Sequence, residues 1–421
     1  MKAKYFIIGL AAALLAGMGA TAQTAIHLAT AGTLKDTSGI KTVTHLTLTG
    51  VIDTRDVKFM RDSMVVLAEL DLSGATVVRY EGKNGTSSSS SSSVAYPANE
   101  MPQYSFCRNS TGKTTLISVK LPAGLTSIGE MAFSNCSGLK ELTLPAGLTA
   151  IGSDAFYNCS GLEELTLPAG LTAIGSYAFQ SCSGLKELTF PAGLTSIGSY
   201  AFQSCSGLDS VTNLSLTPQH IENSVFDGVS IENIALTVPD SAVASYKSAN
   251  VWKDFGSSSS NGITGGGVLL SVKPSNAALG SVSGVLLSGL YPAGTAVSVT
   301  AAPASGYSFW GWTSGGATLS ASATLSFTLT QDTIITASFG KSGSYKLAEA
   351  GTLKDMSGIE SVTHLTLTGA IDARDVKFMR NAMPFLTELD LSEAIVVAYE
   401  GEGGTYPWGY YSYPANEMPQ H

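Results

Sequence analysis

Residues 139–161 read LKELTLPAGLTAIGSDAFYNCSG, and residues 162–184 read LEELTLPAGLTAIGSYAFQSCSG, with differences at four of 23 positions. Consecutive units of this length begin at Leu116, Leu139, Leu162, Leu185 and Leu208. Self-similarity at a short fixed period is typical of solenoids, in which each unit stacks only on its neighbours. Residues 116–230 are therefore predicted to form five stacked 23-residue coils.

One unit shows how a coil would be built. Leu139, Leu142 and Leu144 have the L-x-x-L-x-L spacing of a short strand with one buried face, and Pro145 ends the strand because proline cannot donate to a ladder. The other apolar positions are Leu148, Ile151, Ala155, Phe156 and Cys159. One coil cannot bury this set, but stacked coils can, which predicts a mainly β fold with a parallel sheet along one side. At most one helical turn is expected opposite the sheet.

The flanks of the array continue the same plan. Residues 23–115 are predicted to form an N-terminal cap with longer leucine-rich coils, including a helix near Val57–Met64. Residues 231–255 are predicted to close the other end as a capping segment. Its expected amphipathic helix follows Pro239 and places four side chains on one face: Val243, Tyr246, Trp252 and Phe255.

Two segments carry a family resemblance. The units of the type LPAGLTSIGEMAFSNCSGL (residues 121–139) and the closing VPDSAVASYKSANVWKDF (residues 238–255) resemble the BspA-type leucine-rich repeats of bacterial surface proteins and their capping segment. The resemblance covers about residues 30–255. It implies an adhesin-like role, in binding host matrix proteins, other bacteria or surface glycans, and it brings no catalytic residues.

A second β unit is predicted after the array. Residues 256–267 read as a Gly/Ser linker, and residues 268–340 read as a β-rich module with short strands. The expected strands are Ala296–Ala302, Tyr307–Trp312, Ala323–Leu329 and Thr333–Phe339. This module resembles the divergent internalin B-repeat modules of surface proteins, which implies a small, β-grasp-like spacer or binding unit.

The C-terminal part repeats the N-terminal part. Residues 351–391 match residues 32–72 with ten differences in 41 positions. Residues 345–421 are therefore predicted to be a duplicated, truncated N-terminal cap, the start of a second solenoid in a longer reading frame. With no coil stacked on it, this copy is expected to be marginally stable and to leave the melting of residues 23–340 unchanged.

The N-terminus and the charge indicate the compartment. Lys2 and Lys4, an apolar run over residues 5–17 and the small residues 20–22 predict a signal peptide at residues 1–22. No other apolar stretch of about 18 residues follows, so no stable membrane insertion is expected after cleavage. A formal charge of −9 disfavours nucleic acid as a partner. The protein is thus predicted to be exported, at the cell surface or secreted.

Two groups of side chains resemble a metal or catalytic site, and both are interpreted as structural. Cys136, Cys159, Cys182 and Cys205 recur only at the repeat spacing, so they are expected to be buried free thiols, with Cys107 outside the column. Asp53, Arg55 and Asp56 are interpreted as a helix start with an ion pair. No catalytic, cofactor or metal site is predicted.

Two surfaces are candidates for ligand binding. The outward strand positions of the array are Lys120, Glu141, Thr143, Glu164, Thr166, Glu187 and Thr189. Alternation in the strand near residue 310 places Trp310 and Trp312 on one face, where they could stack on sugar rings. The predicted function is adhesion by binding extracellular proteins through the solenoid face. The alternatives are glycan capture by the β module, or a non-catalytic appendage of a larger surface hydrolase.

Overall fold

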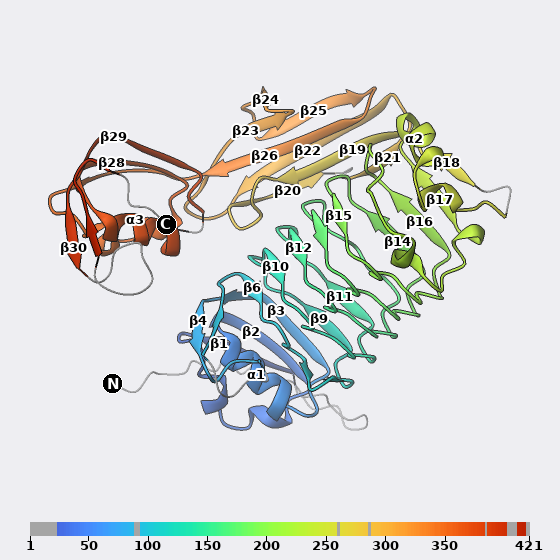
Figure 1. Ribbon diagram of the computed structural model, residues 1–421, viewed down its shortest axis with the longest axis horizontal. Helices are drawn as coiled ribbons and strands as arrows, with labels where there is room; N and C mark the ends of the chain where they lie inside the picture. Colours follow the sequence, from blue (N-terminus) through green and yellow to red (C-terminus); the bar gives the residue numbers. More distant parts are fainter. Residues whose placement is uncertain are drawn as a thin grey trace, which may run out of the picture.

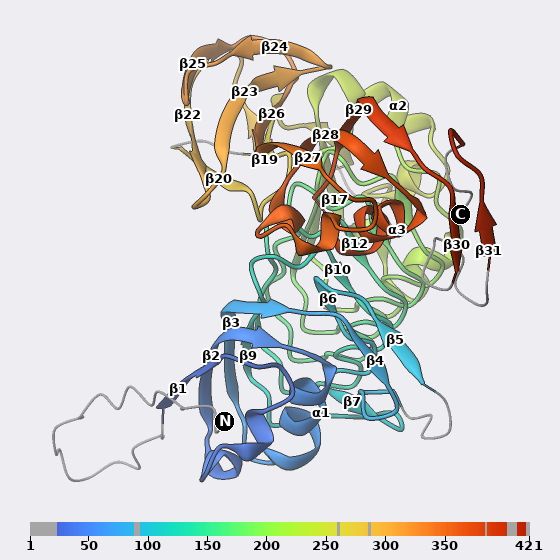
Figure 2. The same ribbon diagram turned by 90° about the vertical axis from the view of Figure 1, so that its left-hand side faces the viewer.

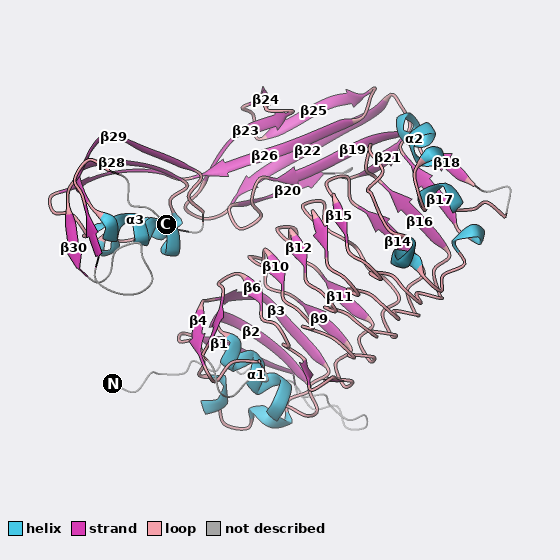
Figure 3. Cartoon of the chain, in the orientation of Figure 1, coloured by secondary structure: helices cyan, strands magenta, loops and turns pink. Residues whose placement is uncertain are grey.

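The computed structural model describes residues 23–87, 93–258, 262–284, 288–383, 385–401 and 411–417. The expected signal peptide, residues 1–22, lies outside these ranges. The described chain is mainly β, as predicted, and a curved stack of coils is followed by a second β unit that folds back beside the stack (Figure 1). Helices are short and lie at the ends of the stack and in the C-terminal part (Figure 3).

The first wall of the stack is the predicted parallel sheet. Its strands in the array are β9 (Ser118–Lys120), β11 (Glu141–Thr143), β14 (Glu187–Phe190) and β16 (Ser210–Asn213). The coil between β11 and β14 joins the wall through a parallel bridge from Thr166 to Thr189. In every coil the leucine or valine at the strand centre is buried, and its two neighbours face outward.

A second wall lies opposite the first and was not predicted. Its strands are β6 (Glu100–Met101), β10 (Ser127–Ile128), β12 (Ala150–Ile151), β13 (Ala173–Ile174) and β15 (Ser196–Ile197), all parallel. The isoleucine of each repeat points inward there. The rest of each coil is turns, which confirms that there is no long helix opposite the sheet.

The turns between the walls use left-handed backbone at two positions per coil. In the third coil these positions are Tyr177 (φ 58°) and Ser181 (φ 61°). The Tyr177 N–H donates to the carbonyl of Ser199 at 2.9 Å, and the Ser181 N–H donates to the carbonyl of Gln203 at 2.8 Å. Because both acceptors belong to the next coil, this strained conformation satisfies polar groups that would otherwise lack partners.

A ladder of phenylalanine rings fills the core between the walls. Its members are Phe106, Phe133, Phe156, Phe179, Phe202 and Phe226, all buried. Neighbouring rings from Phe133 to Phe202 lie 5.2–5.4 Å apart with interplanar angles of 6–10°. The ladder begins at Phe106, in the coil that contains β6, so the array starts one coil earlier than the predicted Leu116.

The N-terminal unit matches the predicted cap. Its main elements are β1 (Gln23–Leu28), β2 (His45–Ile52), α1 (Thr54–Ser63) and β3 (Glu69–Val77). Smaller elements are the 3-10 helices η1 (Leu34–Asp36) and η2 (Ile40–Thr42) and the strands β4 (Tyr80–Gly82), β5 (Val94–Tyr96), β7 (Cys107–Arg108) and β8 (Thr111–Gly112). Strands β1, β2 and β3 extend the first wall in front of β9.

The capping segment closes the far end, but not as one helix. The segment contains η4 (Ile231–Asn233), β17 (Ala235–Val238), η5 (Asp240–Ala242), α2 (Val243–Ser248) and η6 (Trp252–Asp254), and η3 (Asn223–Phe226) precedes it in the last repeat. The predicted single helix is wrong because α2 ends at Ser248, where Ala249 takes extended backbone (φ −80°, ψ 139°), and Val251 beyond it has a positive φ of 65°. Trp252 is nevertheless fully buried, 6.1 Å from the Phe226 ring, and its Nε1 donates to the carbonyl of Gln219 at 2.8 Å.

The predicted linker contains the last strand of the first wall. Strand β18 (Ile263–Gly265) pairs in parallel with β17, with Thr264 opposite Thr237. Glycines and serines surround the sequence I-T-G, so the composition of this stretch predicts a linker and not a strand. Residues 256–267 are therefore not a free tether, and residues 259–261 lie outside the described ranges.

The module at residues 268–340 consists of two sheets. One contains β21 (Gly289–Tyr291), β19 (Val268–Pro274), β26 (Thr333–Gly340), β23 (Ser308–Ser314) and β24 (Ala317–Ser320), in that order. The other contains β20 (Gly280–Gly284), β22 (Thr295–Pro303) and β25 (Thr324–Leu329). The four predicted strands are confirmed, as β22, β23, β25 and β26. A β-grasp would carry a helix across its sheet, and residues 268–284 and 288–340 contain none.

The C-terminal part repeats the N-terminal unit, as predicted. Its elements are β27 (Ser342–Leu347), η7 (Leu353–Asp355), η8 (Ile359–Ser361), β28 (His364–Ile371), α3 (Ala373–Ala382), β29 (Glu388–Val396), β30 (Tyr399–Gly401) and β31 (Tyr411–Tyr413). Leu389 on β29 is 41% exposed, whereas its counterpart Leu70 on β3 is 2% exposed. The difference arises because β9 covers β3, and no described strand covers β29.

The repeated unit is not independent of the β module. The Trp310 ring meets the His364 ring edge-on with centroids 4.0 Å apart, and the Lys341 N–H donates to Thr363 Oγ1 at 2.8 Å. Phe385 packs against the core of the module. Removing residues 345–421 would expose these surfaces, so the expectation that residues 23–340 melt unchanged does not fit the structure.

Candidate binding face of the parallel sheet

The outward side of the first wall carries two regular rows of side chains. The acidic row is Glu141, Glu164 and Glu187, and all three side chains are exposed. The threonine row consists of Thr143, Thr166, Thr189, Thr212, Thr237 and Thr264. Strand alternation places both rows on the same face, because the residue between them in each strand is buried.

Pairing registers align the rows from coil to coil. Glu141 lies opposite Ser118 and Thr143 opposite Lys120, while Thr189 lies opposite Thr212. The coil repeat can be read from the Phe ladder, whose ring centroids are 5.2–5.4 Å apart. The face therefore presents one carboxylate and one hydroxyl about every 5 Å, close to the spacing of paired strands. The structure thus brings the seven solenoid candidates together.

At the N-terminal end of the array, an ion pair and a hydrogen bond join side chains of this face to each other. Lys120 Nζ lies 3.5 Å from Asp71 Oδ2, and Ser118 Oγ donates to Glu141 Oε2 at 3.2 Å. The far edge extends through Thr237 and Thr264, which are not among the predicted residues because the composition around residue 264 predicts a linker. The recurrence of threonine at 212, 237 and 264 was the available signal.

The residues that precede the acidic row alternate in charge. In successive coils they are Lys140, Glu163, Lys186 and Asp209, all exposed. Opposite charges one coil apart balance each other in this row, whereas the acidic row has one sign only. The face therefore combines hydrogen-bonding hydroxyls with a negative stripe, which favours a partner that offers donors or cations.

The acidic cluster at the start of α1 is structural. Asp56 is buried and accepts hydrogen bonds from the N–H groups of Gly32 (2.6 Å), Leu34 (2.9 Å) and Asp53 (3.1 Å). Burial raises the pKa of Asp56, although these hydrogen bonds oppose the rise. Asp53 caps the helix through the N–H of Arg55 and also pairs with its guanidinium at 2.6 Å. These groups are occupied in holding the cap together.

The cysteine column is confirmed as buried free thiols. The thiol of Cys182 donates to the carbonyl of Phe156 in the preceding coil at 3.2 Å, and Cys159 and Cys205 make the equivalent contact with the carbonyls of Phe133 and Phe179. Burial raises the pKa of Cys136 and of Cys205 to about 12. Such thiols are poor nucleophiles and poor metal ligands at neutral pH. No group of His, Cys, Asp or Glu within the described ranges could hold a metal ion.

The expected tryptophan face does not exist. The pairing of β23 with β26 shifts register between Phe309 and Gly311, so a bulge at Trp310 reverses the alternation. Trp312 is fully buried, stacks edge-on against Phe309 and donates from Nε1 to the carbonyl of Ser322 at 3.1 Å. Trp310 is 38% exposed and contacts His364. The two indoles therefore lie on opposite sides of the strand.

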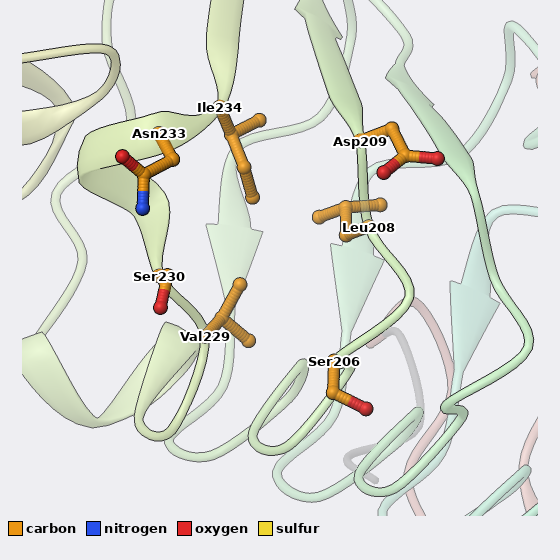
Figure 4. Close-up of a pocket in the computed structure, with 7 residues that line it drawn as sticks. All are labelled: Ser206, Leu208, Asp209, Val229, Ser230, Asn233 and Ile234. Carbon is orange, nitrogen blue, oxygen red and sulfur yellow. The ribbon is translucent and has the colours of Figure 1, made fainter. Parts of the chain in front are cut away.

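A shallow pocket of about 210 Å³ opens near the end of the array (Figure 4). It lies where the strand-to-strand interval changes, because Ser210 pairs with Ala235 instead of a residue 23 positions later. The two extra residues separate the chains around Leu208 and Ile234, and Asp209 and Asn233 lie at the rim (Figure 4). The pocket combines the carboxylate of Asp209 with polar and apolar side chains, and its lining residues contain no catalytic pair.

Comparison with family models identifies both parts of the chain. Residues 99–233 match the BspA type leucine rich repeat region in six copies, which agrees with the extra coil at Phe106. Residues 270–343 match the divergent InlB B-repeat domain. The chain therefore carries BspA-type leucine-rich repeats followed by a divergent InlB B-repeat, as predicted. Proteins of these families are typically non-catalytic. No curated protein matches the chain.

Solved bacterial leucine-rich-repeat structures are similar over part of the chain. A leucine-rich repeat protein of T. pallidum is 29% identical, over 37% of this chain and 74% of that chain, with a TM-score of 0.30. A leucine-rich repeat protein from Bacteroides ovatus is 28% identical, over 39% and 40% respectively, with a TM-score of 0.29. A leucine rich cell surface protein from Faecalibacterium prausnitzii is 23% identical, over 36% and 61%, with a TM-score of 0.21.

Proposed function

We propose that this chain is an exported, non-catalytic, adhesin-like protein that binds extracellular proteins through the outward face of its first wall. The observation that carries the proposal is the pair of aligned rows, one acidic and one of threonines, exposed over successive coils. Leucine-rich-repeat proteins generally mediate protein binding, and the open sheet of a solenoid is a common binding surface.

The chemistry of the face suggests the partner. Carboxylates at a regular spacing of about 5 Å favour a segment with repeated Lys or Arg side chains, and hydroxyls between them supply hydrogen bonds to main-chain groups. The two rows lie along an open sheet face that extends over successive coils, so a large protein surface or an extended segment fits it better than a small molecule. Because exposed charges act mainly on association rates, binding should weaken as salt is added.

The proposed location rests on two observations. Residues 1–22 have the composition of a signal peptide, and BspA-type leucine-rich-repeat proteins are typically surface or secreted proteins. Among the described helices, none is both long and apolar enough to cross a bilayer. Export is testable by comparing the N-terminus of the mature protein with the expected first residue, Gln23.

The test of the binding face is a charge reversal. The full chain and a variant with Glu141→Lys, Glu164→Lys and Glu187→Lys should be compared for binding to a panel of purified matrix proteins. Removing stacked carboxylates cannot unfold the array, because each exposed pair contributes less than about 1 kcal/mol. We expect the variant to fold normally and to lose at least tenfold in affinity for the basic partners of the panel.

A matched control reverses the same amount of charge elsewhere. The variant with Glu130→Lys, Glu222→Lys and Asp254→Lys changes three exposed acids outside the two rows. Binding lost equally in both variants would mean that net charge, and not the face, controls capture. Binding unchanged by the first variant but lost with Trp310→Ala would transfer the site to the β module.

A further inference from the structure

A second, smaller site lies at the start of the array and is independent of the sheet face. A pocket of about 320 Å³ opens between the C-terminal end of α1 and the β7–β8 hairpin, which lie side by side (Figure 2). Its charged lining residues are Arg61, Asp62, Arg108 and Lys113. The neutral polar residues Asn109 and Thr111 complete the rim.

The pocket carries more positive than negative charge. Arg61 donates two hydrogen bonds to the carboxylate of Asp62, of 2.7 and 3.2 Å. The guanidinium of Arg108 is 64% exposed and lies 3.9 Å from Asp62 Oδ2, which is too far for a hydrogen bond. The pocket is therefore lined by three cations and by one carboxylate that Arg61 already pairs, on a chain whose formal charge is −9.

Lys113 adds a buried ammonium with spare donors. Its residue is 8% exposed, and in the described part of the chain the carbonyl of Met64, at 2.6 Å, is the acceptor within hydrogen-bond distance of Nζ. An ammonium can donate three hydrogen bonds. Burial lowers the pKa of Lys113, which means that the neighbouring carboxylate does not compensate the lost hydration. An anion in the pocket would supply that compensation.

The hairpin holds these groups in fixed positions. Asn109 (φ 48°) and Ser110 (φ 61°) form a two-residue turn with both residues left-handed, a geometry that matches the twist of paired strands. A Cβ on Gly112 would lie 2.1 Å from the backbone of Asn135, so the hairpin packs tightly on the next coil. Arg108 and Thr111 are therefore presented by rigid backbone, which lowers the entropy cost of binding.

We propose that this pocket binds one carboxylated sugar unit of an acidic glycan. The volume is at the lower end of the range for small-ligand sites, about 300 Å³, and suits a single ring. Arg108 and Lys113 would hold the sugar carboxylate, while Asn109 and Thr111 would meet the ring hydroxyls. An acidic peptide side chain would reach the cations through an apolar stem, which makes no hydrogen bonds to Asn109 and Thr111, whereas the hydroxyls of a sugar ring can both donate and accept there.

The first experiment compares probes on the full chain by calorimetric titration. Glucuronate, glucose, inorganic sulfate and a short glutamate-containing peptide are the four probes. We expect glucuronate to bind, glucose to bind at least tenfold more weakly, and glucuronate binding to weaken with added salt. Equal binding of glucose, binding of sulfate as tight as that of glucuronate, or binding of the peptide alone would each overturn the proposal.

Two variants with opposite expected signs locate the site. Arg108→Ala removes an exposed cation and should weaken glucuronate binding by about tenfold or more, since a charge-assisted hydrogen bond is lost. Asp62→Asn should tighten it several-fold by removing the repelling charge. The repeated unit shows that this change is compatible with the fold, because Arg380 Nε donates to Asn381 Oδ1 at 2.9 Å in the equivalent position.

The control is Arg79→Ala, which removes an equally exposed guanidinium paired with Glu81 at 3.0 Å, away from the pocket. It should leave glucuronate binding unchanged. If Arg108→Ala has no effect beyond that of Arg79→Ala, or Asp62→Asn weakens binding, the cations of this pocket serve only to hold the backbone carbonyls, and the proposal is wrong.

Discussion

Replacing Phe179 by alanine would remove one ring from the middle of the Phe ladder. The Phe179 side chain is fully buried, and its ring centroid lies 5.2 Å from that of Phe156 and 5.4 Å from that of Phe202. The coils on either side are fixed by both walls and cannot collapse into the space, so a cost of about 3–5 kcal/mol is expected. The two lost ring contacts account for about 1–3 kcal/mol of it.

Equilibrium unfolding in urea, followed by circular dichroism, would measure this cost. The matched control is Tyr177→Ala in the same coil, because Tyr177 also stacks, 5.0 Å from Tyr200, but is 36% exposed. Its loss should be about 1 kcal/mol. Equal losses in the two variants, or a loss below about 1 kcal/mol for Phe179→Ala, would refute the register of the coils and the buried ladder.

Three further predictions follow from the coil geometry. Native protein at pH 8 should not react with a thiol reagent, because the thiols are buried and burial raises the pKa of Cys136 to about 12. All five thiols should react in denaturant. A reactive thiol in the native protein would contradict the buried column. At Ser181 φ is 61°, a conformation that glycine adopts easily and a β-branched residue does not. Ser181→Gly should therefore stabilise the fold by up to about 1 kcal/mol, and Ser181→Val should destabilise it by more. The opposite order in urea unfolding would disprove the left-handed turn. Trp252→Phe should destabilise the fold by about 1–3 kcal/mol, because it leaves the Gln219 carbonyl unpaired. Protection from hydrogen exchange should decrease first at the capped end of the array. A uniform decrease in protection would argue against a local cap.

The repeat was predictable because the same physical demand recurs in every coil. A leucine, a proline, a phenylalanine and a cysteine at fixed offsets each meet their own copy in the next coil, so one unit specifies the stack. The sheet face followed from this register. The second wall did not, because only Ser127–Ile128 and its counterparts pair there, and two residues are too few to show alternation.

The failures have local causes that the sequence pattern does not contain. The bulge at Trp310 adds one residue to a strand and reverses which indole faces the core, although strict alternation predicted one shared face. The helix expected after Pro239 stops at Ser248 because Ala249 takes extended backbone. Strand β18 pairs with β17 although its neighbours are glycines and serines, so tertiary pairing outweighed composition.

Site-specific photocrosslinking would show whether partners bind on the outward face of the first wall. A photoreactive residue would replace Thr166, in the middle of the threonine row, or Tyr177, on the turns outside the sheet face. Each chain would then be irradiated with the tightest-binding protein of the matrix panel. Crosslinked product from position 166 and little from position 177 is the predicted result. Crosslinked product from position 177 alone would show that the partner binds outside the sheet face.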